Sequence, residues 1–370
     1  QPLSVARDSQ RNSGQATSLA GTLAHNRAAT DPEEGTMSTP IPIPSPAALL
    51  QQALAQLYPH GDVIVNNARP VPALQRRAWA ITVQRTDSRA ASQHQFLALF
   101  LPFIRDETDP AARYERAAQH GLPAPTVLAR AEDGTQVVLL CTPPVGDSIA
   151  NSLQQARAPW EVSAAAVSVA RFLDRLHGCS PVDLGIASTS LQDSTEAEQR
   201  IAQLRAAAEG FPVPVRSIVD RILDWIDEQL LPDGPQVPTL NPPRLAALFA
   251  ASGEIAYVLG WDQLAFRSPA DDIAGLLSEL QSFEPALREQ FLSVTMAAYL
   301  QRRDTSLQDV PARALLAHLE RTMTAASARA SRANEPDGTE QDEGMATALL
   351  RAFRAAQSGL VALARHDLTP

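Results

Sequence analysis

The sequence contains no lysine: all 31 basic residues are arginine, against 41 aspartates and glutamates. The chain therefore has no lysine amine for a Schiff base, for a P-loop or for clamping a nucleotide phosphate. A GC-rich, bacterial-type genome that favours arginine codons, or selection against reactive amines, would account for this composition. The formal net charge of -10, without any block of basic residues, argues against a nucleic-acid-binding protein.

Cysteines and long apolar runs are also scarce. Cys141 and Cys179 are the only cysteines, too few for a disulfide framework and without metal-ligand spacing, so we expect buried, unreactive thiols. No apolar run approaches the ~20 residues that cross a bilayer. The first 36 residues lack the apolar segment of a signal peptide. We therefore expect a cytoplasmic protein with neither a membrane nor a nucleic acid as its partner.

The composition and hydrophobic periodicity change along the chain and predict three regions. Residues 1–46 are rich in Ser and Pro and show no periodicity, which indicates a disordered tail. Residues 47–142 form a small N-lobe, with a five-stranded sheet plus a helix. Residues 143–370 form a larger helical C-lobe, with a disordered acidic loop near 333–344. The predicted fold class is thus α+β, with two lobes and a cleft between them.

Individual segments carry this prediction. The runs DVIVNNA, AWAITVQRT and QFLALFLPF have strand character, and PTVLARAEDGTQVVLLCTPP reads as a hairpin that turns at Asp133-Gly134. The segment DPAARYERAAQHG is helical. Farther along, PWEVSAAAVSVARFLDRLHG is an amphipathic helix that stops at Gly178, and MATALLRAFRAAQSGLVALARH closes the chain as another helix.

Three stretches also have the order and spacing of a known family. They read HGLPAPTVLARAEDGTQVVLLCTPPVGDSI, VARFLDRLHGC and SGEIAYVLGWDQLAFRSPADDIAGLL. The third is the most specific, because it combines a turn glycine, a strand, a tryptophan, a proline and Asp-Ile-Ala. On these stretches the chain resembles, from about residue 47 to 325, the aminoglycoside phosphotransferase and choline-kinase-like branch of the protein-kinase fold.

The resemblance implies four polar elements that the chain lacks. In that family a small-lobe Lys or Arg holds the nucleotide phosphates, and a His-Gly-Asp loop supplies the base. An Asn five residues later and a strand-end Asp before a Trp hold magnesium. The corresponding positions are degenerate: Phe100, Leu240, Asn241, Pro242, Ala247 and Gly260.

The absence of these catalytic and metal-binding residues does not depend on how the chain is aligned with the family. From Gly234 to Trp261 there is no His and no Asp, and Glu254 is the only carboxylate. Pro242 and Pro243 further remove two backbone donors from the loop. We therefore expect no metal site and no productive binding of ATP or magnesium.

Four other residues are candidates for contacts in the cleft, and a fifth, Asp272, is a candidate for a structural brace. Asp262 is a single carboxylate and so a poor magnesium site, and it fits a capping or solvated Asp as well. Glu115 matches a helix glutamate whose lysine partner is missing. Arg244 is the one cation in the altered loop and either binds an anion or points to solvent. His177 suits a packed helix end, and the resemblance implies that Asp272 braces the loop.

These features favour a catalytically inactive relative, a pseudokinase that acts as a binding, scaffold or regulatory subunit for a protein or peptide partner. An enzyme of altered chemistry that uses Arg244, Glu254, Asp262 or His177 is one alternative. A residual small-molecule phosphotransferase is another, and a helical interaction protein with a coincidental likeness is a third. The C-terminal helices offer a surface for an oligomer.

Overall fold

The computed structural model describes residues 46–60, 62–71, 77–86, 91–103, 109–186, 196–230, 236–240, 243–330 and five positions within 347–354. These residues fall into two compact units. The first lies within Gln1–Val71, Arg76–Phe103 and Leu128–Pro143, and the second within Ile104–Val127 and Pro144–Pro370. The sequence analysis placed residues 104–127 in the small lobe, whereas their contacts group them with the second unit.

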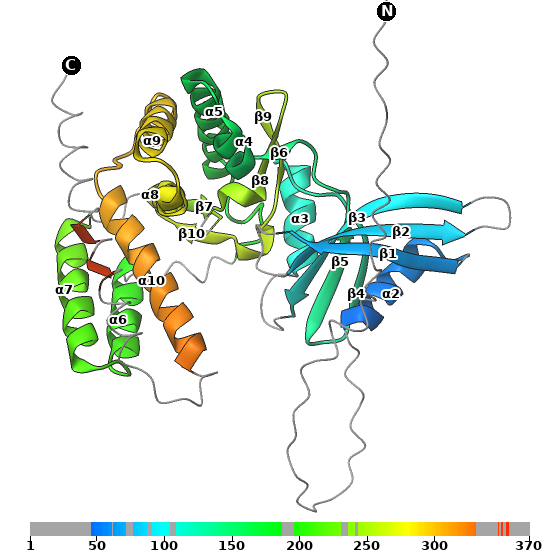
Figure 1. The fold of residues 1–370 in the computed structure, drawn as a ribbon, viewed down its shortest axis with the longest axis horizontal. Coiled ribbons are helices and arrows are strands. Elements are labelled where there is room, and N and C mark those ends of the chain that lie inside the picture. Colours follow the sequence, from blue (N-terminus) through cyan, green and yellow to red (C-terminus); the bar gives the residue numbers. More distant parts are fainter. Residues whose placement is uncertain are drawn as a thin grey trace, which may run out of the picture. The chain divides into compact units, whose positions relative to one another are not determined.

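The first unit is an antiparallel sheet with one helix (Figure 1). Its five strands follow the order β1-β2-β3-β5-β4. The elements are α2 (Pro46–Leu57), β1 (Asp62–Pro70), β2 (Ala78–Thr86), β3 (Ala91–Pro102), β4 (Val127–Glu132) and β5 (Gln136–Cys141).

Alternation along the strands builds the core of this unit. Residues two apart on a strand face the same side of the sheet. Apolar residues at this spacing on β2, β3 and β5 pack against one face of α2. The buried cluster contains Leu49, Leu50, Ala53, Leu54, Ile81, Val83, Phe96, Ala98, Val138 and Leu140, among others. The turn between β4 and β5 is fixed by Asp133, whose Oδ1 accepts hydrogen bonds from the Thr135 and Gln136 N–H groups, both at 2.8 Å. Hydrogen bonds from Thr135, first of all from its hydroxyl, lower the pKa of the Asp133 carboxyl.

The second unit is mainly helical, with two small sheets in the orders β6-β8-β9 and β10-β7. Its helices are α3 (Pro110–Gln119), α4 (Ile149–Gln155), α5 (Pro159–His177), α6 (Glu196–Ala208), α7 (Val213–Gln229), α8 (Pro269–Glu279), α9 (Pro285–Leu300) and α10 (Val310–Ala330). Its other elements are β6 (Asp147–Ser148), β7 (Val237–Thr239), η3 (Leu245–Ala247), β8 (Leu248–Ala251), β9 (Glu254–Val258), η4 (Trp261–Gln263), β10 (Ala265–Arg267) and η5 (Leu280–Ser282).

Local sequence signals explain where these elements begin and end. α5 starts at Pro159, a residue favoured at the first helical position, and is capped by Gly178. β8 and β9 form a two-residue hairpin at Ser252 and Gly253, with φ values of 54° and 80°. Positive φ at both central residues matches the right-handed twist of the paired strands.

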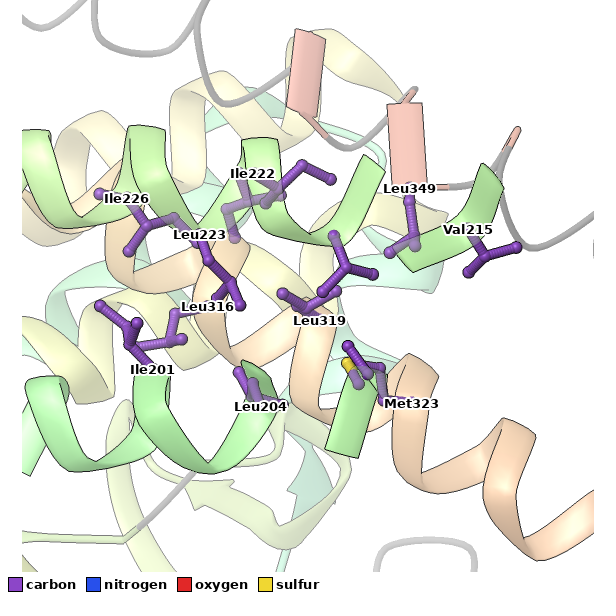
Figure 2. Close-up of a cluster of buried hydrophobic side chains, with 14 residues drawn as sticks. Ile201, Leu204, Val215, Ile222, Leu223, Ile226, Leu316, Leu319, Met323 and Leu349 are labelled. Atoms are coloured by element: carbon purple, nitrogen blue, oxygen red, sulfur yellow. The ribbon is translucent and has the colours of Figure 1, made fainter. Parts of the chain in front are cut away.

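Helices α6, α7 and α10 enclose a second apolar cluster, shown in Figure 2. Leu223 and Ile226 on α7 face Leu316 and Leu319 on α10. Leu349, near the end of the chain, packs against the same cluster. Every helix within the described residues is too short or too polar to cross a membrane.

Gly146 occupies a position that admits no other residue without movement. Its φ is 86°, and a Cβ there would lie 2.0 Å from the Ala250 carbonyl oxygen. Gly134 has a similar φ of 84° but open space around the same point. We expect Gly134→Ala to cost about 1–2 kcal/mol from the left-handed backbone alone, and Gly146→Ala about 1–3 kcal/mol more from the clash. Urea unfolding of the two variants measures the difference in their free energies of unfolding. Equal losses of stability would contradict a clash between a Cβ at residue 146 and the Ala250 carbonyl.

The structure confirms the predicted α+β class, with a β-rich N-terminal part and a helical C-terminal part. The five-stranded sheet argues against a helical interaction protein with a coincidental likeness. The predicted tail and the acidic loop near 333–344 lie outside the described residues, apart from Pro46 in α2. The same holds for most of the predicted closing helix.

Candidate ligand site

Gly260 follows β9 at the point where the family resemblance places a metal-binding carboxylate. Its φ of 98° and ψ of 16° turn the backbone through the left-handed region into η4. Glycine adopts this conformation without steric cost, which gives a conformational reason for a glycine after a buried strand. A Cβ at this position would meet no atom within 4 Å, so the space above Gly260 is open.

That space is part of a small pocket within the second unit. Its lining consists of Leu240, Pro243, Arg244, Ala247, Leu259, Gly260 and Gln263. The β8–β9 hairpin brings η3 back to the end of β9, and the Leu259 N–H donates to the Ala247 carbonyl at 3.0 Å. Arg244 is the only charged side chain in this lining. Four of the predicted site residues are thus brought together: Leu240, Arg244, Ala247 and Gly260. Asn241 and Pro242 lie outside the described residues.

Asp262 is directed toward α3. Its Oδ1 accepts a hydrogen bond from the Tyr114 hydroxyl at 3.2 Å, and its carbonyl accepts one from Arg113 Nη1 at 2.8 Å. The Tyr114 hydroxyl also lies 3.4 Å from the Gly260 N–H. The carboxylate therefore takes part in joining α3 to η4, which neither the capping nor the solvated reading described.

His177 and Asp272 belong to a buried chain of hydrogen bonds. The His177 Nδ1 lies 2.7 Å from the Tyr299 hydroxyl, and its Nε2 lies 3.1 Å from Asp272 Oδ2. The Leu240 N–H donates to Asp272 Oδ1 at 3.0 Å. Leu240 lines the pocket, so the hydrogen bond to Asp272 fixes the position of one lining residue. His177 in turn contacts Asp272 through Oδ2. Asp272 thus contacts Leu240, just before the altered loop, and its role as a brace stays a prediction.

The proton positions in this chain follow from the number of available partners. Burial raises the pKa of Tyr299, so its hydroxyl keeps its proton. If that hydroxyl donates to His177 Nδ1, then Nε2 carries the ring proton and donates to Asp272. This assignment gives each polar hydrogen a partner, as buried groups require.

The other predicted residues lie away from the pocket. Phe100 packs against the core of the first unit. Glu115 is exposed on α3. Glu254, the first residue of β9, pairs with Arg171 Nη1 at 2.5 Å. No group of three metal-binding side chains is present in the described part of the chain.

Both cysteines were expected to be buried, and this holds for Cys141 but not for Cys179. Cys141 is fully buried, and burial raises the pKa of its thiol to about 12. Cys179 is only half-buried, although burial also raises the pKa of its thiol.

The sequence analysis did not predict an ion-pair network that connects α6, α8 and α10. Asp271 bridges Arg200 and Arg313, each at 3.0 Å, and so joins α8 to α6 and α10. Arg200 also pairs with Glu320 at 2.6 Å, and Arg313 with Asp309 at 2.7 Å. The spacing of Asp309 and Arg313, four apart at a helix start, was a visible signal. No local signal points to Arg200.

The fold is that of known antibiotic phosphotransferases. Aminoglycoside phosphotransferase APH(4)-Ia, in ternary complex with ADP and hygromycin B, is similar with a TM-score of 0.54 and 15% identity over 82% of this chain and 98% of that one. The GDP complex of an aminoglycoside 2'-phosphotransferase-IIIa variant gives 0.52 and 11%, over 84% and 97%. Macrolide 2'-phosphotransferase MphH from Brachybacterium faecium gives 0.50 and 19%, over 80% and 97%.

Identities this low establish the fold alone, and no curated protein matches the sequence. The family itself is shown by a sequence profile. The profile of the phosphotransferase enzyme family matches residues 104–316, more than half of the chain. This chain therefore belongs to the phosphotransferase enzyme family.

Proposed function

We propose that this member of the family is catalytically inactive and acts as a binding, scaffold or regulatory subunit for a protein or peptide partner. The observation that carries the proposal is the charge at the pocket. The strand-end position is Gly260, and the described lining contains one charged group, the cation Arg244.

The residues present do not fit a magnesium ion. Magnesium takes octahedral oxygen ligands, usually one or two carboxylates with phosphates and waters. The lining offers the Gln263 amide and backbone groups but no carboxylate, and the Asp262 carboxylate already accepts from Tyr114. Each charge-stabilising group in phosphoryl transfer contributes roughly 10²–10⁵-fold to the rate. Losing several of them leaves no useful turnover.

A binding role also needs an exposed surface. Trp160, on the first turn of α5, is 69% exposed. Large aromatic side chains of this kind are common energetic centres of protein interfaces. This feature supports a protein partner over a purely structural role.

The direct test is activity with Mg-ATP. The purified full chain should hydrolyse no ATP above background and transfer no phosphate to aminoglycosides, macrolides or protein fractions, under conditions in which an active aminoglycoside phosphotransferase turns over. Mg-ATP should also raise its melting temperature no more than ATP with EDTA. A magnesium-dependent rise that Asp262→Asn removes, or measurable turnover, would defeat the proposal.

A further inference from the structure

A short helical stretch near the end of the chain packs against α7. Leu349, Leu350 and Phe353 are helical there, and Leu349 is fully buried in the apolar cluster of α6, α7 and α10. Figure 2 shows the Leu349 side chain directed toward α7. Phe353 lies four residues later and so on the same face of the helix. Its ring is 5.3 Å from that of Trp225 on α7, at an angle of 82°.

The face of α7 that meets Phe353 has the spacing of a helix-binding surface. Ile218, Ile222 and Trp225 are four and three residues apart, which places them on one stripe of the helix. Ile222 is fully buried, whereas Ile218 and Trp225 are only partly buried. We call these three residues the α7 stripe. Helices that bind in grooves are held through large apolar side chains at such spacings, and Leu349 and Phe353 match them.

The two surfaces are also complementary in charge. The sequence of α7, VPVRSIVDRILDWIDEQ, contains four acidic residues and two arginines. The stretch MATALLRAFRAAQSGLVALARH, residues 345–366, contains three arginines and no Asp or Glu. We call it the C-terminal segment. The α7 stripe is thus set in an acidic helix, which favours a basic amphipathic helix as its ligand.

The C-terminal segment is attached to the rest of the unit mainly by its own contacts. It lies beyond residues 104–316, which match the family profile. Residues 331–344, between α10 and the segment, include five acidic residues and no Leu, Ile, Val, Met or aromatic residue. A short helix is marginal on its own in water, and the entropic cost of ordering it opposes the burial of its apolar side chains. Such a contact can open locally while the remaining core stays folded.

We infer that the α7 stripe is the docking surface for a basic amphipathic helix of a partner protein, with large apolar residues four apart, and that the C-terminal segment occupies this surface when the partner is absent. The inference rests on the proposed function, a binding role, and assigns to it a surface and a class of ligand. Because the segment belongs to the same chain, it competes at an effective concentration of about millimolar.

A fluorescein-labelled peptide of residues 345–366, used in place of the partner's helix, tests the inference by fluorescence anisotropy. Binding to the unchanged full chain should be weak, because the attached segment competes. A release variant of the full chain, Leu349→Asp with Phe353→Asp, places charges against the apolar cluster and should bind the peptide at least ten-fold more tightly. The matched control is Thr347→Asp with Leu350→Asp, which adds the same charges at exposed positions and should bind as weakly as the unchanged chain.

A tryptophan pair locates the binding surface. In the release variant, Trp225→Ala should abolish peptide binding, because it removes the ring that Phe353 meets. Trp160→Ala, which removes an exposed tryptophan on α5, should leave the affinity unchanged. Absence of peptide binding to the release variant would overturn the inference, as would equal affinity for the unchanged chain or binding that survives Trp225→Ala.

Hydrogen exchange of the unchanged chain provides a second test, which also applies if circular dichroism shows that the release variant does not fold. Backbone amides of the C-terminal segment should exchange at least ten-fold faster than those in the middle of α7, because the segment opens alone. Equal protection would show that the segment is an integral part of the core and would overturn the inference.

Two further outcomes separate the possible explanations. A dimer of the unchanged chain that dissociates in the release variant, as measured by light scattering, would make a second copy the ligand of the α7 stripe and overturn the inference. Turnover of Mg-ATP defeats the proposed function whatever the peptide does. Failure of the peptide to bind, in a chain without turnover, defeats only the inference.

Discussion

Replacing Asp271 by alanine is expected to lower the free energy of unfolding by about 3–5 kcal/mol, the usual loss when one partner of a buried ion pair is removed. Asp271 Oδ1 and Oδ2 each accept from a different arginine, Arg200 and Arg313, at 3.0 Å. The three side chains are only 9%, 8% and 3% exposed. Without the carboxylate, the pairs with Glu320 and Asp309 remain, and the two buried guanidinium groups repel each other across the gap.

The matched control for this prediction is an exposed pair in the same unit. Arg205 contacts Asp224 at 2.7 Å, but the side chains are 38% and 64% exposed. Arg205→Ala should therefore cost less than about 1 kcal/mol, and added salt should reduce that cost further. Urea titrations of both variants at low and high salt provide the comparison. A loss for Asp271→Ala as small and as salt-sensitive as that for Arg205→Ala would show that the network contributes little.

The elements that the sequence predicted best are those with strong local patterns. The observed β2 has the predicted bounds, because Ile81 and Val83 alternate with more exposed residues. The observed α5 runs to the residue before Gly178, as its apolar spacing and stop signal indicated. Both patterns are legible within a window of about 11–18 residues.

Local sequence patterns predicted less of the candidate site, because the residues that form it are distant from one another in the sequence. The resemblance selected Ala247 and Gly260, and the β8–β9 hairpin accounts for their proximity. It could not show that Gly260 has positive φ, which makes the glycine a conformational choice as well as a lost ligand. Arg200 on α6 and Asp271 on α8 form an ion pair at 3.0 Å although they are 71 residues apart along the chain. Pairings between distant helices leave no periodic signal in either segment.

Asp272→Ala is the second substitution for which we expect a large loss, about 2–6 kcal/mol, since two fully buried donors would lose their acceptor at about 1–3 kcal/mol each. The alanine removes the acceptor of the Leu240 N–H and of His177 Nε2 together. Urea unfolding followed by tryptophan fluorescence measures this loss.

Asp272→Asn distinguishes a lost acceptor from a lost charge. The asparagine Oδ1 can still accept from the Leu240 N–H, while its Nδ2 becomes a donor that faces His177 Nε2. The ring can meet that donor by moving its proton to Nδ1, and the Tyr299 hydroxyl must then accept where it formerly donated. We expect a cost of about 1–3 kcal/mol, set by the one hydroxyl hydrogen left without a partner. Tyr299→Phe removes that hydrogen, but it also removes the acceptor that Nδ1–H now needs, so the double variant should gain nothing. Nitrogen NMR of the His177 ring would report the change of tautomer, and an Nε2–H signal that is unchanged in Asp272→Asn would contradict the expected shift of the proton to Nδ1.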